Sequence, residues 1–236
     1  MRKYPLMLDY MRCMLEGKSL RACADEVGIC LKTSFEWRHK ILAAIRALEG
    51  GISFSGIVEA DELLMNYSEK GRKFKSKEEY MRAKKKKHPK VAVLVVTDRE
   101  GNLLFKHLGD KKVKNEQLKE ELKNRLSEGN LICVKPKKEF KKAVKSLQSK
   151  KVIVNKRQIK RGIYSVKIVE SKISDFKTWV SRFHGVATKY LQSYLMWFVI
   201  MNKYLKELID PDIGRLLNLS SHDRWAWDKY REIITQ

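Results

Sequence analysis

The stretch GIVEADELL, from Gly56 to Leu64, decides the fold, because it follows the pattern of a buried strand and yet carries three acids. Its apolar residues predict a short strand that ends near Asp61. Neighbouring strand residues face opposite sides, so we expect Glu59 and Glu62 to point away from Asp61 as solvated or salt-bridged acids. A carboxylate at a strand end is costly to bury unless it is paired or serves a cation.

The residues after this stretch predict an α/β fold in which a mixed sheet is flanked by helices. KVAVLVVTD (90–98) and NLLFKHL (102–108) lie on either side of a glycine-containing turn, which predicts an antiparallel hairpin. Beyond this hairpin, helical and strand patterns alternate as crossover units. These segments are NEQLKEELKNRLSEG (115–129), LICV (131–134), KKEFKKAVKSLQ (137–148) and KVIV (151–154).

The last third of the chain predicts long helices that cover the sheet, since its apolar residues recur at helical spacing. The stripe consists of Ile173, Phe176, Trp179, Phe183, Leu191, Leu195 and Phe198. The longest apolar stretch, Tyr190 to Met201, is shorter than the ~20 residues that span a bilayer. We therefore expect no membrane partner.

The first 50 residues predict a helical DNA-binding domain. Ser19 is placed to cap a helix, LRACADEV, that stops at Gly28, and a second helix begins with LKTSFEWRHKIL. This pattern fits a helix-turn-helix, but it also fits an ordinary hairpin of two helices. In a helix-turn-helix the second helix would enter the major groove, and Trp37 would pack inward. The residues presented to DNA would be Lys32, Thr33, Ser34, Glu36 and Arg38.

Gly50-Gly51 marks a linker, so we expect a DNA-binding domain at 1–50, an α/β domain at 51–208 and a helical tail at 209–236. The 236 residues, 43% of them hydrophobic, suffice for one sizeable core and a small accessory domain. The N-terminus lacks the pattern of a signal peptide, which favours a cytoplasmic protein. The spacing of the four cysteines also favours a reducing compartment and predicts small buried thiols. They are Cys13, Cys23, Cys30 and Cys133.

Charge is the strongest compositional signal, with 51 Lys and Arg against 28 Asp and Glu and a formal net charge of +23. Residues 135–161 contain twelve basic residues and a single acid, Glu139, and Lys84 to Lys87 form a second cluster. Such an excess favours a polyanion as partner. A lysine-rich solvated surface is the alternative, because charge alone does not specify DNA.

Four segments together carry a resemblance to a known family. The sequence resembles the DDE-type transposases of bacterial insertion sequences, in the ISXO-like group, which join a helix-turn-helix to a ribonuclease-H-like domain. This resemblance implies metal-dependent cleavage and transfer of DNA strands, with Mg²⁺ or Mn²⁺ as cofactor. It also implies double-stranded DNA, both element ends and target, as partner and a homo-oligomer assembled on it. The segments are SLRACADEVGICLKTSFEWRHKILAAI, GIVEADE, ICVKPKKEF and FKTWVSRFHGVATKYLQSYLMWF.

The resemblance also implies the site. Asp61 matches the family's first catalytic aspartate, Glu170 its third ligand position and Lys177 its lysine, so Asp61 and Glu170 are the candidate metal ligands. Spacing of seven places Glu170 and Lys177 on one helical face. The second carboxylate is replaced by Lys135, whose ammonium group would repel a divalent ion. We expect Asp61, Lys135 and Glu170 to converge.

Two further features of this chain differ from the family. Ser165 stands where relatives carry a histidine, and the zinc ribbon that often precedes the helices is missing. We therefore expect no structural zinc and a shortened or fragmentary product, unless a longer start exists upstream in the genome. Glu139, one helical turn from Lys135, is a candidate replacement ligand. The hypotheses are therefore a catalytically impaired transposase, a non-catalytic DNA-binding protein derived from one, and a ribonuclease-H-like nuclease unrelated to transposition.

Overall fold

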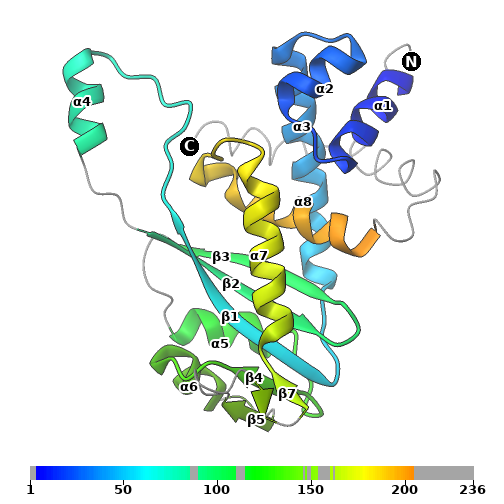
Figure 1. The fold of residues 1–236 in the computed structure, drawn as a ribbon, viewed down its shortest axis with the longest axis vertical. Coiled ribbons are helices and arrows are strands. Elements are labelled where there is room, and N and C mark those ends of the chain that lie inside the picture. The colour runs from blue at the N-terminus through cyan, green and yellow to red at the C-terminus, as the bar shows by residue number, and fades with distance from the viewer. Residues whose placement is uncertain are drawn as a thin grey trace. The chain divides into compact units, whose positions relative to one another are not determined.

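The computed structural model describes residues 4–85, 90–109, 115–145, 147, 150–153, 160–161 and 163–204 (Figure 1). The chain divides into two compact units. The first, helical unit comprises residues up to Ile52, Asp175–His184 and the residues from Gln192 onward, and the second comprises Ser53–Ser174 and Gly185–Leu191. The expected helical tail at 209–236 lies outside the described residues. The division at Gly50-Gly51 stays a prediction.

The second unit is built on a five-stranded mixed sheet with the strand order β3-β2-β1-β4-β5. β2 is antiparallel to both of its neighbours, β3 and β1, and β4 and β5 run parallel to β1. This order is that of the ribonuclease-H-like sheet, and it confirms the predicted fold class. The strands are β1 (Ile57–Asn66), β2 (Lys90–Asp98), β3 (Leu103–Gly109), β4 (Leu131–Val134) and β5 (Lys150–Ile153).

The predicted hairpin is confirmed as β2 and β3. Every residue of β2 after Lys90 is buried, as expected for a β-branched run covered on both faces. Asp98 ends the strand and is itself only 2% exposed. Its carboxylate accepts hydrogen bonds from the backbone N–H groups of Ser55, Glu100 and Asn102. The turn therefore satisfies a buried acid locally, in the manner of an Asx turn.

Strand β1 is longer than the sequence predicts. It continues past Asp61 to Asn66, because β2 pairs with it from Val58 to Asn66. The parallel partner β4 covers only Ile57 to Ala60. Asp61 is therefore not at the end of the strand, but at the point where β1 loses its neighbour on one side.

Helices connect and cover these strands. α5 and α6 follow the predicted crossover pattern and bury Leu118, Leu122, Phe140 and Val144. α7 begins in the second unit and continues into the first, whose boundary falls at Asp175. The remaining elements of the second unit are α4 (Lys77–Lys85), α5 (Asn115–Lys123), α6 (Lys138–Lys145), β6 (Lys160–Arg161), β7 (Tyr164–Ser165), α7 (Lys167–Ser181) and the 3-10 turn η2 (Thr188–Tyr190).

The two helices predicted in the first 50 residues are confirmed. The Ser19 side chain accepts a hydrogen bond from the Ala22 N–H, and Gly28 ends the helix with φ +71°, a left-handed conformation that favours glycine. The helices of this unit are α1 (Tyr4–Leu15), α2 (Leu20–Val27), α3 (Leu31–Arg46), the 3-10 helix η1 (Ala47–Gly51) and α8 (Leu191–Tyr204).

The aromatic stripe of the last third packs differently from the prediction. Phe176, Trp179 and Phe183 belong to the helical unit, not to the sheet-containing one. Trp179 lies edge-on to Trp197 of α8 at 4.9 Å between ring centroids, and Phe183 lies 5.2 Å from the same ring. Leu195 and Phe198 also belong to the helical unit, whereas Ile173 and Leu191 belong to the second unit, so most of the stripe packs in the core of the helical unit.

The cysteines follow the prediction with one exception. Cys13, Cys23 and Cys133 are buried thiols, whereas Cys30 is exposed at the residue before α3. Its sulfur lies 3.5 Å from the Thr33 backbone nitrogen, so it takes the place of a capping side chain at the start of that helix. No helix in the described part of the chain is long and apolar enough to cross a membrane.

Candidate functional site

The site lies where β1 and β4 separate. The parallel register pairs Ala60 with Val134, so the next residues along the two strands, Asp61 and Lys135, emerge beside each other. β4 ends here because Pro136 has no N–H group with which to continue the ladder. The sheet register thus brings together two residues that are 74 positions apart.

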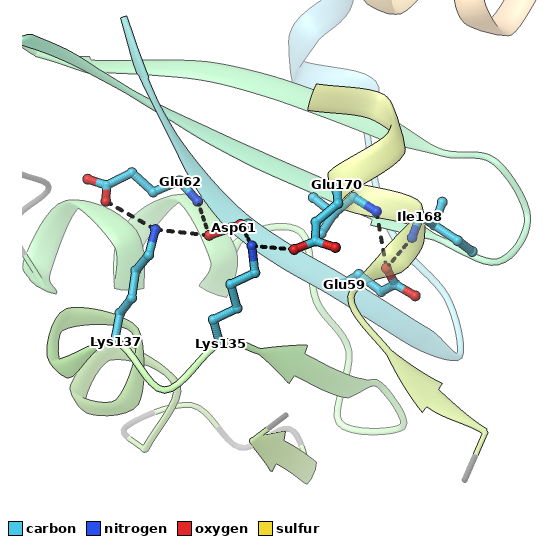
Figure 2. Close-up of polar contacts among 8 residues, drawn as sticks. Glu59, Asp61, Glu62, Lys135, Lys137, Ile168 and Glu170 are labelled. Carbon is cyan, nitrogen blue, oxygen red and sulfur yellow. Dashed lines mark hydrogen bonds and ion pairs between the residues drawn. The ribbon is translucent and has the colours of Figure 1, made fainter. Parts of the chain in front are cut away.

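Lys135 joins two carboxylates from different elements. Its Nζ lies 2.6 Å from Asp61 Oδ2 and 2.6 Å from Glu170 Oε1 on the first turn of α7 (Figure 2). The Asp61 side chain is 5% exposed, that of Lys135 25% and that of Glu170 39%. The expected convergence of these three residues is confirmed.

Lys137 is a second cation in the site, and the sequence analysis missed it. Its Nζ lies 3.0 Å from Asp61 Oδ1 and 3.4 Å from Glu62 Oε2. It reaches both carboxylates because, in the described parts of the chain, no strand pairs with this edge of β1 beyond Ala60. The Glu62 N–H donates to Asp61 Oδ1 at 2.8 Å. Both oxygens of Asp61 are therefore engaged, and Glu62 is salt-bridged as predicted.

The ionic contacts shift the pKa values of the central pair in opposite directions. Burial disfavours the Asp61 carboxylate, but the ammonium groups of Lys135 and Lys137 and the Glu62 N–H outweigh it, so the pKa of Asp61 lies below its usual 3.8. Burial likewise disfavours the Lys135 ammonium, but Asp61 and Glu170 outweigh it and raise the pKa of Lys135 above 10.5. Both groups are charged at neutral pH.

These shifts predict how stability depends on pH. The lowered pKa of Asp61 adds stability that is present above pH 3.8 and is lost as pH falls through the folded-state value, while the contribution of Lys135 persists up to pH 10.5. Between pH 5 and pH 2, we expect Asp61→Asn to lose less free energy of unfolding than the unmodified chain, because it has no carboxylate to protonate at this position. Urea titrations measure this difference. The exposed Asp175→Asn should behave like the unmodified chain, and equal acid losses in all three proteins would contradict the assignment.

Glu59 corrects the prediction that it faces away from Asp61. Residues two apart share a strand face, so Glu59 lies on the same side as Asp61 and is only 1% exposed. One carboxylate oxygen accepts the backbone N–H groups of Ile168 and Val169, at 2.8 and 3.1 Å, at the start of α7 (Figure 2). A strand side chain therefore caps this helix and holds the turn that carries Glu170.

Two side chains complete the surroundings of Glu59. Arg99 Nη2 lies 2.9 Å from Glu59 Oε1, and the Ser165 hydroxyl donates to the same oxygen at 2.9 Å. Ser165 thus helps to position the carboxylate that caps the helix. Glu59 is a salt-bridged acid, as one of the predicted alternatives states. The twofold strand period was the sequence signal that could have placed it.

The arrangement does not fit a divalent metal. Mg²⁺ and Mn²⁺ require several free oxygen ligands, but both oxygens of Asp61 face ammonium groups, and Lys135 holds Glu170 as well. Two unit charges about 4 Å apart repel by about 4 kcal/mol at an effective dielectric near 20, and a divalent ion doubles this cost. Within the described part of the chain, no group of three or more His, Cys, Asp or Glu side chains could hold a metal. The Lys135 ammonium instead supplies the positive charge between Asp61 and Glu170.

The structure does not place the two other candidate residues in this cluster. Lys177 is exposed on α7 and belongs to the helical unit. Glu139 lies in α6, but its side chain is outside the described residues, so its role as a replacement ligand stays a prediction.

The candidate DNA-contacting residues divide into an exposed and a buried set. Lys32 is exposed, and Thr33 and Glu36 are partly exposed on the first turns of α3. Ser34 is buried, contrary to the prediction, because its hydroxyl donates to the Leu20 carbonyl at 2.8 Å. Trp37 packs edge-on against Tyr10, which agrees with its predicted inward orientation.

Arg38 is the larger correction, since it is 0% exposed. Its Nη2 donates to the Lys18 carbonyl at 2.8 Å, and the guanidinium lies over the rings of Trp197 and Phe183. Guanidinium groups stack favourably on aromatic faces, which explains a buried charge without a carboxylate. Arg38 stabilises the helical unit and cannot reach a phosphate from this position.

Comparison with known proteins places this site in a family. The family described as ISXO2-like transposase domain matches residues 53–200, which include Asp61, Lys135 and Glu170. The comparison with curated proteins gives no match. Among solved structures, the crystal structure of a pre-cleavage Mos1 transpososome is similar, with a TM-score of 0.36 and 10% identity over 95% of this chain and 76% of that chain. Because the family match spans more than half of the 236 residues, the chain belongs to the ISXO2-like transposase domain family.

Proposed function

We propose that this member of the transposase family binds duplex DNA but does not cut it. The observation that carries the proposal is the position of Lys135 Nζ, 2.6 Å from both Asp61 and Glu170. Transposases of this kind generally use divalent metals, which activate the attacking oxygen and stabilise the leaving one. An ammonium group has no open coordination position, so it cannot perform either step.

DNA binding is supported by charge and by the geometry of α3. The chain carries a net charge of +23, and sequence-independent affinity for DNA comes chiefly from neutralised phosphates. The first turns of α3 follow the short turn after Gly28 and expose Lys32, with Thr33 and Glu36 partly exposed. A helix-turn-helix reads the major groove with residues at this position. Element ends and target DNA are the proposed partners, and a homo-oligomer on DNA is the proposed assembly.

The test combines binding and cleavage on one substrate. We expect the full chain to bind a duplex that carries the inverted repeats flanking the gene, with log affinity falling steeply as log salt concentration rises. Lys32→Ala should raise Kd about fivefold, whereas the exposed Lys123→Ala on α5 should leave it unchanged. In Mg²⁺ or Mn²⁺, a gel assay should detect no nicking of the labelled duplex.

Each part of the proposal can fail separately. A flat response of affinity to salt would contradict DNA binding. Metal-dependent nicking that is lost in Asp61→Ala would instead show that the site is catalytically competent.

A further inference from the structure

A lysine-rich segment follows β1 and precedes β2. Residues 67–85, which we call the basic arm, contain eight Lys and Arg residues against three acids. The arm ends in α4, which stands away from the sheet (Figure 1). Among the described side chains of α4, none is buried. Nothing in the proposed site uses this element.

The base of the arm is fixed to the second unit. The Ser68 N–H donates to Thr188 Oγ1 at 2.9 Å, and the Thr188 N–H donates back to the Ser68 carbonyl at 2.8 Å. Lys70 Nζ donates to the Gly185 carbonyl at 2.9 Å. These contacts hold the arm against residues 185–191, which follow α7.

The outer part of the arm is preformed by its own contacts. Ser76 caps α4 by accepting the Glu79 N–H at 3.2 Å, and Glu79 accepts the Lys75 N–H at 2.8 Å, in the manner of a capping box. Arg72 bridges Glu69 and Glu79 at 2.8 and 3.0 Å and lies over the Phe74 ring. Gly71, with φ +86°, allows the turn before Arg72. The arm thus has a defined shape although no core covers it.

Because of its internal ion pairs, the arm exposes mostly positive charge. Two of its three acids, Glu69 and Glu79, are paired to Arg72. The side chains that remain exposed include the cations Lys73, Lys75, Lys77, Arg82 and Lys85 and the large side chains Tyr80 and Met81. Exposed lysines on a preformed arm complement a phosphate backbone, and ordering such an arm on DNA costs little entropy.

We infer that the basic arm holds the phosphate backbone of duplex DNA, as a contact separate from α3. This inference rests on the proposed DNA-binding function. It assigns the arm a sequence-independent role, because lysine contacts to phosphates fix position and carry no base information. Each lysine that neutralises a phosphate adds about 0.9 to the slope of log affinity against log salt.

Paired substitutions in the full chain test the inference. Lys73→Gln with Lys77→Gln removes two charges from the arm, and Lys119→Gln with Lys123→Gln removes two exposed charges from α5 as the matched control. Fluorescence anisotropy over a range of salt concentrations is measured with the inverted-repeat duplex and with an unrelated duplex of equal length. The arm pair should reduce the slope by about 2 on both duplexes, and the control pair should leave it unchanged. All substituted residues are exposed, so circular dichroism should show native folding in each variant.

The outcomes separate this inference from the proposed function. If the unmodified chain binds with a steep slope and the arm pair matches the control pair, the arm does not contact DNA, although the proposed function stands. If the arm pair changes the mass measured by light scattering and leaves the slope intact, the arm is a contact between copies of this chain and the inference is wrong. If the unmodified chain shows no salt dependence, the proposed function itself fails.

Discussion

Glu59→Ala should lower the free energy of unfolding by about 3–5 kcal/mol, the largest stability effect that we expect from a single change in the second unit. The substitution leaves Arg99 and the N–H groups of Ile168 and Val169 without their acceptor in a site that is 1% exposed. Each buried donor that loses its acceptor costs about 1–3 kcal/mol, whereas the Arg99 side chain is 37% exposed and can be solvated. Urea unfolding at neutral pH measures the loss.

Two variants make this result interpretable. Glu59→Gln keeps an acceptor for the helix N–H groups and loses the charge, so we expect a smaller loss of about 2 kcal/mol. Glu62→Gln removes an acid that has one longer contact to Lys137, at 3.4 Å, and should cost less than about 1 kcal/mol. Hydrogen exchange at Ile168 and Val169 should accelerate in Glu59→Ala. A loss no larger than that of Glu62→Gln would show that the cap does not stabilise α7.

Lys135→Asp should create a divalent-metal site where the unmodified chain has none. The change removes the ammonium group between Asp61 and Glu170 and adds a third carboxylate within the same cluster. We expect Mn²⁺ to bind with a Kd of about 1 mM or tighter, the range of weak carboxylate sites. Lys137 still contacts Asp61, so Lys135→Asp combined with Lys137→Met should bind more tightly than Lys135→Asp alone.

The variant Lys135→Met tests whether loss of the positive charge is enough for metal binding, or whether an added oxygen ligand is needed. It removes the positive charge without adding an oxygen, so we expect no measurable Mn²⁺ binding in this variant. We do not expect DNA cleavage to return in Lys135→Asp if, as the sequence analysis predicts, Ser165 replaces a histidine of the family. Equal metal binding by the Asp and Met variants would show that charge alone, and not ligand number, had kept the metal out.

Much of the secondary structure could be predicted because its signals are local. The β-branched run of β2, the turn before β3 and the capping residues Ser19 and Gly28 act through neighbouring residues. The length of β1 could not be predicted, since it depends on pairing with β2 far along the chain. The α4 helix was missed although Ser76 and Glu79 form the spacing of a capping box.

Most residues of the site could be predicted from the sequence, but their contacts could not. The resemblance supplied Asp61, Lys135 and Glu170, and the parallel register of β1 and β4 explains why they converge. Lys137 follows a proline and a chain reversal, so no periodic pattern points to its contact with Asp61. Arg38 looked like a surface cation because it is charged.

The burial of Arg38 nevertheless has a sequence signal. Ser34, Arg38, Leu42 and Ile45 recur at helical spacing on one side of α3, and all four are buried. The partners that make this burial possible, Trp197 and Phe183, lie more than 140 residues further along the chain. The charge of Arg38 therefore predicted a surface position, and only its helical spacing from Ser34 and Leu42 indicated that it is buried.

The most direct test of the account is a calorimetric titration of Mn²⁺ into the unmodified chain, with Asp61→Ala and Lys135→Asp titrated in parallel. The account predicts heats of specific binding for Lys135→Asp alone, because only that variant replaces the ammonium group by a ligand. Specific binding by the unmodified chain that disappears in Asp61→Ala would contradict it, since a metal would then occupy the position assigned to the Lys135 ammonium.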